Sequence, residues 1–284
     1  MTDLREGQWQ IGDLKFGKGT QISISGMDQV GYEVTPGDYP IPQSDEIRFR
    51  RDFIKPGVLQ FGLSIVDNYV LPGFEGAVNY EPADELLERF SREWRADEVR
   101  REWGWVKPLT YRGPGKTRML FGRPRNLASD RRKSRSGWYG LTCSYQLSDS
   151  LSYSEDVTSI PVQVGVESSI ARDDGQAPSW LTVYFSGPAT NPVFQIGPNL
   201  VSMDVTLSTG DILVLAAAPW ERRAVVYRAS GTDENVGWRM IDGSAFLEDL
   251  RLPEKKTWSV KVTASGTSSE THCVVGWREA YHAI

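Results

Sequence analysis

The stretch Asp84–Trp103, DELLERFSREWRADEVRREW, carries a helical pattern within a chain that otherwise favours strands. Its large apolar residues recur at three- and four-residue spacing, which places them along one face of a helix, with a slip before the last two. These residues are Leu87, Phe90, Trp94, Val99 and Trp103. Such an aromatic stripe more often packs into a core than lines a groove for a cofactor or a partner. The stretch therefore predicts one principal helix laid across a sheet.

The ends of this segment carry the signals of a helix start and stop. Asp84 suits the N-cap position, and the carboxylate of Glu85 lies where the positive end of the helix dipole favours it. Arg100 lies near the negative end, and Gly104 marks the stop. We expect a helix over about residues 84–103.

The remainder of the chain favours strands on both sides of this helix. Short runs of alternating or continuous apolar residues are bounded by Gly, Pro, Asp and Asn, which is typical of sandwiches and barrels and not of a βαβ pattern. No internal repeat at a fixed period accompanies them. The runs are ISISG, LQFGLSIV, RMLFG, YGLTCSYQLS, SWLTVYFSG, PVFQIG, SMDVTLS, DILVLAAA, AVVYRAS and WSVKVTASG.

A change in composition near Ser154 to Ser159 divides the chain into two domains. Beyond it the strand pattern becomes more regular, and the connections DDGQAPS, GPATNP, SGTDEN and SGTSSE are typical of hairpin turns and short loops. We expect an N-terminal domain over residues 1–156, which includes the helix, and a second β domain over residues 157–284.

The segment Gly113-Pro114-Gly115-Lys116-Thr117 resembles the end of a phosphate-binding loop, G-x-x-x-x-G-K-[ST]. The first glycine of that motif would be residue 110, which is Thr110. The residues that follow Thr117 favour a strand, so no helix N-terminus would receive the phosphate. We therefore expect a tight hairpin between two strands, and not a nucleotide site.

Composition excludes several classes of protein. The 284 residues carry 32 Lys and Arg against 37 Asp and Glu, a net charge of −5, which gives no electrostatic reason for a nucleic-acid partner. Cys143 and Cys273 form no metal-ligand or disulfide motif. The longest apolar run, Ile212 to Trp220, is shorter than the roughly 20 residues that cross a bilayer, and the N-terminal residues do not resemble a secretory signal. We expect synthesis in a cytoplasm and no membrane insertion.

No motif indicates catalysis. His272 and His282 have no second ligand at metal spacing, and no G-x-S-x-G elbow occurs. The carboxylate pairs Asp173-Asp174 and Asp233-Glu234 fall in segments that favour turns, where Asp bonds to the local backbone. The sequence predicts no catalytic residue, no metal ligand and no cofactor, and hence a protein that is not an enzyme.

Tryptophan is the more informative residue type. Its indole fills a core or a subunit interface, or stacks on a sugar, and for most of the ten tryptophans a core or interface is the safer interpretation. Trp220 and Trp238 lie next to loops, in AAAPWERR and ENVGWRM. We take these two as candidate carbohydrate-stacking residues.

The order of these features resembles a known family. The first half runs through ISGMDQ, RFRRDFIKPGVLQFGLSIVDN, DELLERFSREW, FGRPR and YQLSDSLSYSED, and the second through VYFSGPATNPVFQI, LSTGDILVLAAA, VTASG and VVGWREAYHAI. This pattern, which spans nearly the whole chain, is similar to that of the distal tail proteins, also called minor tail proteins, of long non-contractile-tailed bacteriophages. Its most specific pieces are Gly122-Arg123-Pro124 and the segment from Gly187 to Pro192.

The resemblance implies a fold and a role. The fold is mainly β, with an N-terminal β-sandwich or split-barrel-like domain that carries one principal helix, followed by a galectin-like jelly-roll sandwich. Proteins of this family form a six-membered ring at the distal end of the tail in the virion. The ring joins the tail tube protein to the tail-tip hub proteins and leaves a channel through which the genome DNA passes. In some members the C-terminal domain binds host cell-surface carbohydrate.

A ring needs interfaces between its subunits, and the sequence offers candidates. The basic cluster Arg131-Arg132-Lys133-Ser134-Arg135 has no interleaved aromatic residues, so a solvated loop or a contact with a neighbouring subunit is favoured over nucleic acid. Two aromatic residues flank Lys55-Pro56-Gly57 in strands, and a core position is favoured over an interface for each. The candidates for ring contacts are Phe53, Phe61, Arg131, Arg132 and Arg135.

Two alternatives to a structural ring protein stay open. One is a carbohydrate-binding, lectin-like module that uses Trp220 or Trp238. The other is a glycoside hydrolase, which would need a pair of carboxylates in a cleft, and the sequence gives no reason to choose one.

Overall fold

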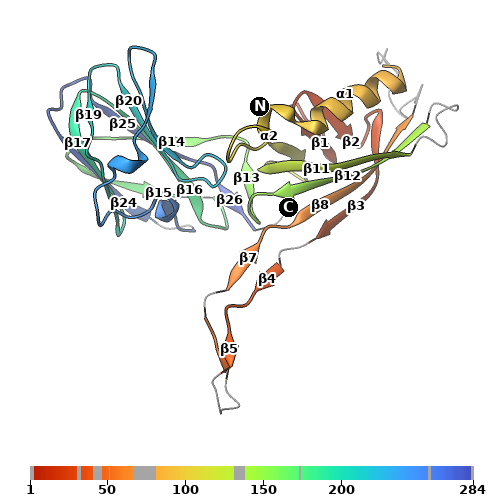
Figure 1. Cartoon of the computed structure of the whole chain (residues 1–284), viewed down its shortest axis with the longest axis horizontal. Coiled ribbons are helices and arrows are strands. Elements are labelled where there is room, and N and C mark those ends of the chain that lie inside the picture. Colours follow the sequence, from red (N-terminus) through yellow and green to blue (C-terminus); the bar gives the residue numbers. More distant parts are fainter. Residues whose placement is uncertain are drawn as a thin grey trace. The chain divides into compact units, whose positions relative to one another are not determined.

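A computed structural model describes residues 3–30, 33–40, 47–50, 52–66, 81–130, 138–172, 174–254 and 257–282. The chain is mainly β and forms two compact units, Met1–Ser152 and Tyr153–Ile284 (Figure 1). The sequence placed the boundary at 156/157, and the units divide four residues earlier. Of the helices in the described ranges, none combines the length and the apolar composition needed to cross a membrane.

Unit 1 contains the principal helix and two groups of antiparallel strands. β11, β12, β8 and β3 pair in that order, as do β2, β1, β9 and β10. Two short ribbons, β4 with β7 and β5 with β6, interrupt the β3–β8 hairpin. The elements are β1 (Gln8–Ile11), β2 (Leu14–Gly17), β3 (Ile22–Val30), β4 (Glu33–Thr35), β5 (Tyr39–Pro40), β6 (Ile47–Arg48), β7 (Phe53–Lys55), β8 (Val58–Val66), α1 (Ala83–Arg95), α2 (Asp97–Arg100), β9 (Leu109–Arg112), β10 (Thr117–Leu120), β11 (Gly122–Asp130) and β12 (Trp138–Leu147).

The core of unit 1 is a chain of aromatic rings that α1 seals. Phe90 and Trp94 stack on each other at 5.3 Å between ring centroids. Phe90 meets Phe16 of β2 edge-on at 6.1 Å, and Trp94 meets Phe61 of β8 at 6.2 Å. The indole N–H of Trp94 donates to the Asn126 carbonyl of β11 at 3.0 Å, which satisfies a polar atom that would otherwise be buried unpaired. The predicted packing of the helical face on the sheet is confirmed.

The end of the predicted helix is wrong. α1 ends at Arg95, and Ala96 adopts a left-handed conformation with φ of 47°, so the chain turns before the short α2. The turn brings Val99 back into the core, but Trp103 lies beyond it and is 99% exposed. The predicted start also moves, because Pro82 occupies the N-cap position. Asp84 lies in the first turn of α1, where its carboxylate accepts a hydrogen bond from the Tyr139 hydroxyl.

A buried lysine ties the two helices together across this turn. The ammonium of Lys107 donates to Glu93 of α1 and to Glu98 of α2, each at 2.7 Å. Burial alone would lower the pKa of Lys107, but the two hydrogen bonds to carboxylates outweigh it and hold that pKa above its usual value. The hydrogen bond from Lys107 also lowers the pKa of Glu98.

The glycine-rich segment 113–117 is a hairpin, as predicted. β9 and β10 pair antiparallel with Arg112 opposite Thr117, and the amide of Gly113 donates to the Lys116 carbonyl at 3.2 Å. Gly115 takes a positive φ of 77°, which a residue with a side chain adopts only with strain. A strand follows the lysine in place of the helix that a phosphate-binding loop requires.

Unit 2 is a two-sheet antiparallel sandwich of the jelly-roll type. One sheet has the order β14-β25-β16-β20-β21-β22, with β23 also on β16, and the other has the order β15-β24-β17-β18, with β19 on β17. Phe185 and Phe194 meet edge-on between the sheets at 5.5 Å. The elements are β13 (Ser152–Ser154), β14 (Thr158–Val162), β15 (Glu167–Ala171), β16 (Ser179–Ser186), β17 (Ala189–Ile196), β18 (Asn199–Ser202), β19 (Thr206–Leu207), β20 (Ile212–Ala216), β21 (Arg223–Tyr227), β22 (Asp233–Asn235), the 3₁₀ helices η2 (Gly237–Arg239) and η3 (Leu247–Asp249), β23 (Arg251–Leu252), β24 (Thr257–Ser265), β25 (His272–Trp277) and β26 (Ala280–Tyr281).

The prediction that two carboxylate pairs lie in turns is confirmed for one residue and wrong for the other pair. Asp174 accepts the amide of Gly175, the local backbone bond that the turn interpretation predicts, and Asp173 lies outside the described residues. The turn interpretation is wrong for Asp233-Glu234, which belongs to β22. There Glu234 pairs with Arg228 and Arg239, which accounts for its charge.

Two tryptophans that the sequence placed on the same helical face should differ sharply in their effect on stability. Trp94→Ala removes a fully buried ring and leaves a cavity, so we expect the free energy of unfolding to fall by about 3–5 kcal/mol. Trp103→Ala removes an exposed ring and should change it by less than about 0.5 kcal/mol. Urea denaturation of the full chain, followed by circular dichroism, measures both. Equal losses would contradict the division between α1 and the exposed segment after α2.

Candidate functional site

A pocket of about 280 Å³ opens on unit 2 beside the outer face of the sheet that contains β16 and β25. Side chains alternate along β16, so Thr182 and Tyr184 face away from the core that holds Val183 and Phe185. Thr182 lies opposite Gly276 of β25, and a Cβ at Gly276 would come within 3.5 Å of Val157, another lining residue. The lining residues are Tyr153, Val157, Trp180, Thr182, Tyr184, Ala218, Trp220, Glu221, Gly276, Trp277 and Arg278.

The turn after β20 supplies the outer wall of this aromatic pocket. The amide of Glu221 donates to the Ala218 carbonyl at 2.9 Å, which closes the turn and sets Trp220 and Glu221 side by side. The Trp220 indole meets the buried ring of Tyr153 edge-on at 5.0 Å between centroids. Trp220 is therefore held by packing while part of its ring stays accessible.

The pocket wall also contains two charged side chains of opposite sign, Glu221 and Arg278. Arg278 donates from Nη1 to the carbonyls of Ser154 and Glu155. Both of these bonds to described residues start at one nitrogen, which leaves Nε and Nη2 as donors for a ligand. Burial lowers the pKa of Arg278, and the carboxylates of Asp156, Glu221 and Glu155 oppose that effect. Burial, together with the charge of Glu221, raises the pKa of the Tyr184 hydroxyl, so Tyr184 is protonated at neutral pH.

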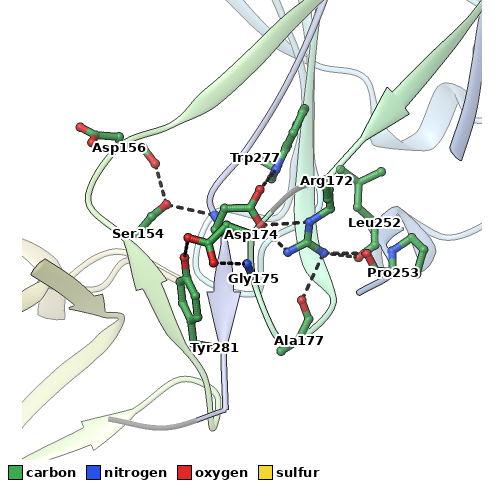
Figure 2. Close-up of polar contacts among 11 residues, drawn as sticks. Ser154, Asp156, Arg172, Asp174, Gly175, Ala177, Leu252, Pro253, Trp277 and Tyr281 are labelled. Carbon is green, nitrogen blue, oxygen red and sulfur yellow. Dashed lines mark hydrogen bonds and ion pairs between the residues drawn. The ribbon is translucent and has the colours of Figure 1, made fainter. Parts of the chain in front are cut away.

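A buried ion pair lies next to Trp277, the last residue of β25 (Figure 2). The Arg172 guanidinium is fully buried and donates to Glu279 Oε2 from Nε at 3.0 Å and from Nη2 at 2.5 Å. Its Nη1 donates to three carbonyls, those of Ala177, Leu252 and Pro253. The other oxygen of Glu279 accepts the indole N–H of Trp277 at 2.7 Å. The charges are thus both paired and hydrogen-bonded, as buried ions require.

The same network holds the start of unit 2. The amide of Glu279 donates to Ser154 Oγ at 3.0 Å, and the amide of Ser154 donates to the Glu279 carbonyl at 2.8 Å. Gly175 lies against the pair with φ of 87°, and a Cβ there would come within 2.3 Å of Arg172 Nη2. A side chain at position 175 is therefore incompatible with the ion pair.

Unit 1 has a different feature, an arm of exposed apolar residues. We define the arm as strands β4 to β7, described over residues 33–40, 47–50 and 52–55; these strands project beyond β3 and β8 in Figure 1. The side chains of Val34, Ile47, Phe49 and Ile54 are exposed along it, and Met27 is exposed at its base on β3. Within the arm, Arg50 lies over the Tyr39 ring at 4.4 Å from the centroid.

A second exposed apolar feature of unit 1 follows α2. Trp103 and Trp105 flank Gly104, and both indoles face solvent. We call residues 102–105 the tryptophan loop. Arg123 of β11 donates from Nε to the Trp105 carbonyl at 2.5 Å and from Nη2 to the Glu102 carbonyl at 2.7 Å. The loop is therefore anchored at both ends while its rings point outward.

Solved structures of phage proteins share the whole architecture. The structure of the Dit protein of phage SPP1, called a paradigm of the hub adsorption apparatus in phages that infect Gram-positive bacteria, matches with a TM-score of 0.58 and 14% identity. That match covers 96% of this chain and 98% of the other. A chain of the phage P2 baseplate in its activated conformation with calcium matches with a TM-score of 0.60 and 10% identity, over 98% and 99% of the two chains.

The chain has the fold of a phage distal tail hub protein. The phage p2 baseplate in its activated conformation with strontium gives the same result, with a TM-score of 0.59, 10% identity and coverage of 98% and 99%. No family model matches the sequence, and no curated protein sequence matches it significantly. The fold that the sequence resemblance implied, a helix-bearing β domain followed by a jelly-roll, is confirmed.

The residues predicted to stack on sugar or to form ring contacts have different environments in the structure. Trp220 lines the aromatic pocket, whereas Trp238 lies on η2 and is 76% exposed, with the Arg239 guanidinium 4.8 Å from its ring centroid. Phe61 is fully buried, the core position that the sequence favoured, so it offers no surface to a neighbour.

The remaining predicted ring-contact residues lie in the arm or outside the described residues, and two features were not predicted from the sequence. The backbone of Phe53 pairs with Thr35 in the arm, and Arg131, Arg132 and Arg135 lie outside the described residues. The ion pair of Arg172 with Glu279 joins residues 107 positions apart, which no local pattern signals. The tryptophan loop was missed because Trp103 had been assigned to the helical face.

Metal ligands and a reactive thiol are two further kinds of site to consider in the described ranges. Among these residues no group of three His, Cys, Asp or Glu side chains lies close enough together to hold a metal ion. Cys143 and Cys273 are buried and unpaired as thiols. Burial raises the pKa of Cys143, and it raises that of Cys273 to about 12, so neither thiol is nucleophilic at neutral pH.

Breaking the buried ion pair should destabilise unit 2. Arg172→Leu leaves Glu279 buried and uncompensated, so we expect the free energy of unfolding to fall by about 3–5 kcal/mol. The matched control is Arg222→Ala, which removes a partly exposed pair with Glu248 and should cost less than about 1 kcal/mol. Urea denaturation of the full chain, followed by tryptophan fluorescence, gives both values. A similar small loss for the two variants would contradict a stabilising role for the pair.

Proposed function

We propose that the protein is a structural component of a phage virion, a ring-forming hub at the distal end of the tail. The observation that carries this proposal is the fold match to the SPP1 hub protein, which extends over nearly the full length of both chains and includes both units. In this role six copies join the tail tube protein to the tail-tip proteins and surround a channel through which DNA passes. The protein then acts by assembly and not as an enzyme.

The arm supports the ring. Two-stranded ribbons of two or three residues per strand are marginal in water unless they pack against something else. The arm also exposes Ile47, Phe49 and Ile54, and among the described residues each of its ribbons has only two strands, whose outer edges can extend a neighbour's sheet. A neighbouring copy in a ring would cover these groups, and a head-to-tail interface that closes by rotation provides such a neighbour for every copy.

Light scattering after size exclusion tests the ring directly. We expect the mass to rise with concentration from that of the 31.8 kDa chain towards six times that value, with annular particles in negative-stain images of the same fraction. A mass that stays at one chain at the highest attainable concentration, with and without tail tube protein, would sink the proposal.

The structure supplies a matched control for this measurement. Val30 of β3 lies opposite Val58 of β8, so an Asn-Gly turn in place of residues 31–57 closes the hairpin without the arm. This variant should keep the circular dichroism of the folded sheets and elute as a monomer. Assembly that survives removal of the arm would show that the ring is built from other surfaces.

The aromatic pocket favours a second function, carbohydrate binding by unit 2. Sugars are bound by an aromatic ring that packs on their C–H face together with polar groups that bond their hydroxyls. Trp220 provides the ring, and Glu221, Arg278 and Tyr184 provide acceptors and donors around it. One lining residue, Glu221, is a carboxylate, whereas glycoside hydrolysis uses two, so the pocket suits binding and not cleavage.

A glycan panel measures this second function. We expect binding of a pyranose-containing cell-surface glycan to fall at least tenfold on Glu221→Gln, which keeps the shape of the pocket and removes a charged acceptor. Trp220→Ala should abolish binding, and Trp238→Ala, which removes an exposed indole outside the pocket, should leave it unchanged. Binding that depends on Trp238 alone would move the site to η2, and no binding across the panel would exclude the function.

A further inference from the structure

We propose, as a consequence that rests on the ring, that the arm of one copy packs on the tryptophan loop of the next. The contact would be between Phe49 and its neighbours on one chain and the indoles of Trp103 and Trp105 on the other.

The distribution of exposed apolar side chains in unit 1 points to these two surfaces. Among its described residues, every large apolar side chain that is well exposed belongs either to the arm and its base or to the tryptophan loop. The first group is Met27, Val34, Ile47, Phe49 and Ile54, and the second is Trp103 and Trp105. Large apolar side chains gathered in this way mark interaction surfaces.

A head-to-tail interface needs two different surfaces on each copy that complement each other. The arm and the tryptophan loop meet this requirement because they lie on different sides of unit 1. In Figure 1, α2, which leads into the loop, lies on the helix-covered side, whereas the arm runs away from the sheet in the opposite direction. Within one chain the arm therefore does not cover the tryptophan loop. Between two copies, the arm of one can cover the loop of the other.

The tryptophan loop is built as a receiving surface. Its backbone is held by the two hydrogen bonds from Arg123, so the indoles lose little conformational freedom when a partner binds. Tryptophan is also the residue type most enriched among those that dominate binding energies at interfaces. Trp103, at 99% exposure, gains the most from being covered.

The residues around Phe49 suit an indole surface. Phe49 offers the indoles an exposed aromatic partner. Exposed Arg48 and Arg50 flank it, and within the arm Arg48 donates to the Tyr39 hydroxyl at 3.2 Å while Arg50 lies over the Tyr39 ring. The exposed carboxylate of Glu102 lies next to Trp103 and adds a charge opposite to theirs. Arg101 precedes it with the same sign as Arg48 and Arg50, so the pairing relies on the rings and not on net charge.

Cross-linking between two single-cysteine variants tests the contact. Phe49→Cys and Trp103→Cys each add one exposed thiol, and the native Cys143 and Cys273 are buried. With a short bismaleimide reagent, we expect a covalent dimer when the two variants are mixed and little when either is treated alone. The double variant should give a ladder of cross-linked species that ends at the ring. The matched control mixes Phe49→Cys with Trp238→Cys, whose exposed thiol lies in unit 2, and should give no dimer above background.

A second measurement relates the contact to assembly. Trp103→Ala with Trp105→Ala should raise the concentration at which half of the protein is assembled by roughly tenfold or more, because such anchors commonly contribute above 1.4 kcal/mol. Lys116→Ala, on the exposed β9–β10 turn, serves as the surface control.

The outcomes separate this inference from the hub function. A ring that forms while the mixture gives no dimer, or that tolerates the double alanine variant, overturns the arm–loop contact and leaves the hub standing. Dimers from either cysteine variant alone show a twofold arrangement and also overturn it. If the protein neither assembles into a ring nor forms cross-linked dimers, both proposals are overturned.

Discussion

The second unit depends on the pairing of a fully buried guanidinium with a carboxylate. Arg172 follows β15, Glu279 lies between β25 and β26, and the carbonyls that complete the guanidinium's bonds come from residues 177, 252 and 253. Because an unpaired charge in this position would be costly, the segments that supply these partners are fixed together. The same carboxylate accepts the indole N–H of Trp277, which lines the aromatic pocket, so the ion pair orients one of the pocket's rings.

Unit 1 is organised by apolar packing. Its strands and α1 converge on Phe16, Phe61, Phe90 and Trp94, and Lys107 adds a charged tie between α1 and α2. The interior is therefore satisfied without the arm or the tryptophan loop. The large apolar side chains of these two surfaces are exposed and lie outside that core.

Local sequence was informative where local physics decides the structure. The apolar spacing predicted the buried face of α1, and the glycine pattern predicted the hairpin at 113–117, because helix periodicity and turn conformation depend on neighbouring residues. The end of α1 could not be predicted, since Ala96 adopts a conformation that usually requires Gly or Asn. The partner of Arg172 and the exposure of each tryptophan depend on distant segments. For the same reason the sequence could not rank Trp220 against Trp238 as a pocket residue.

The position of the arm has a consequence for how such a chain can diverge. The register of β3 and β8 is set by their own ladder from Ile22 opposite Ile65 to Val30 opposite Val58, so segments inserted between residues 30 and 58 leave that ladder unchanged. Within the arm, however, side chains alternate between two faces, and adding a single residue to one strand reverses which face they occupy. Length changes in steps of two keep each side chain on its face of the ribbon, and odd steps move it to the other face. Arms of different reach can therefore arise on one scaffold, with parity as the constraint.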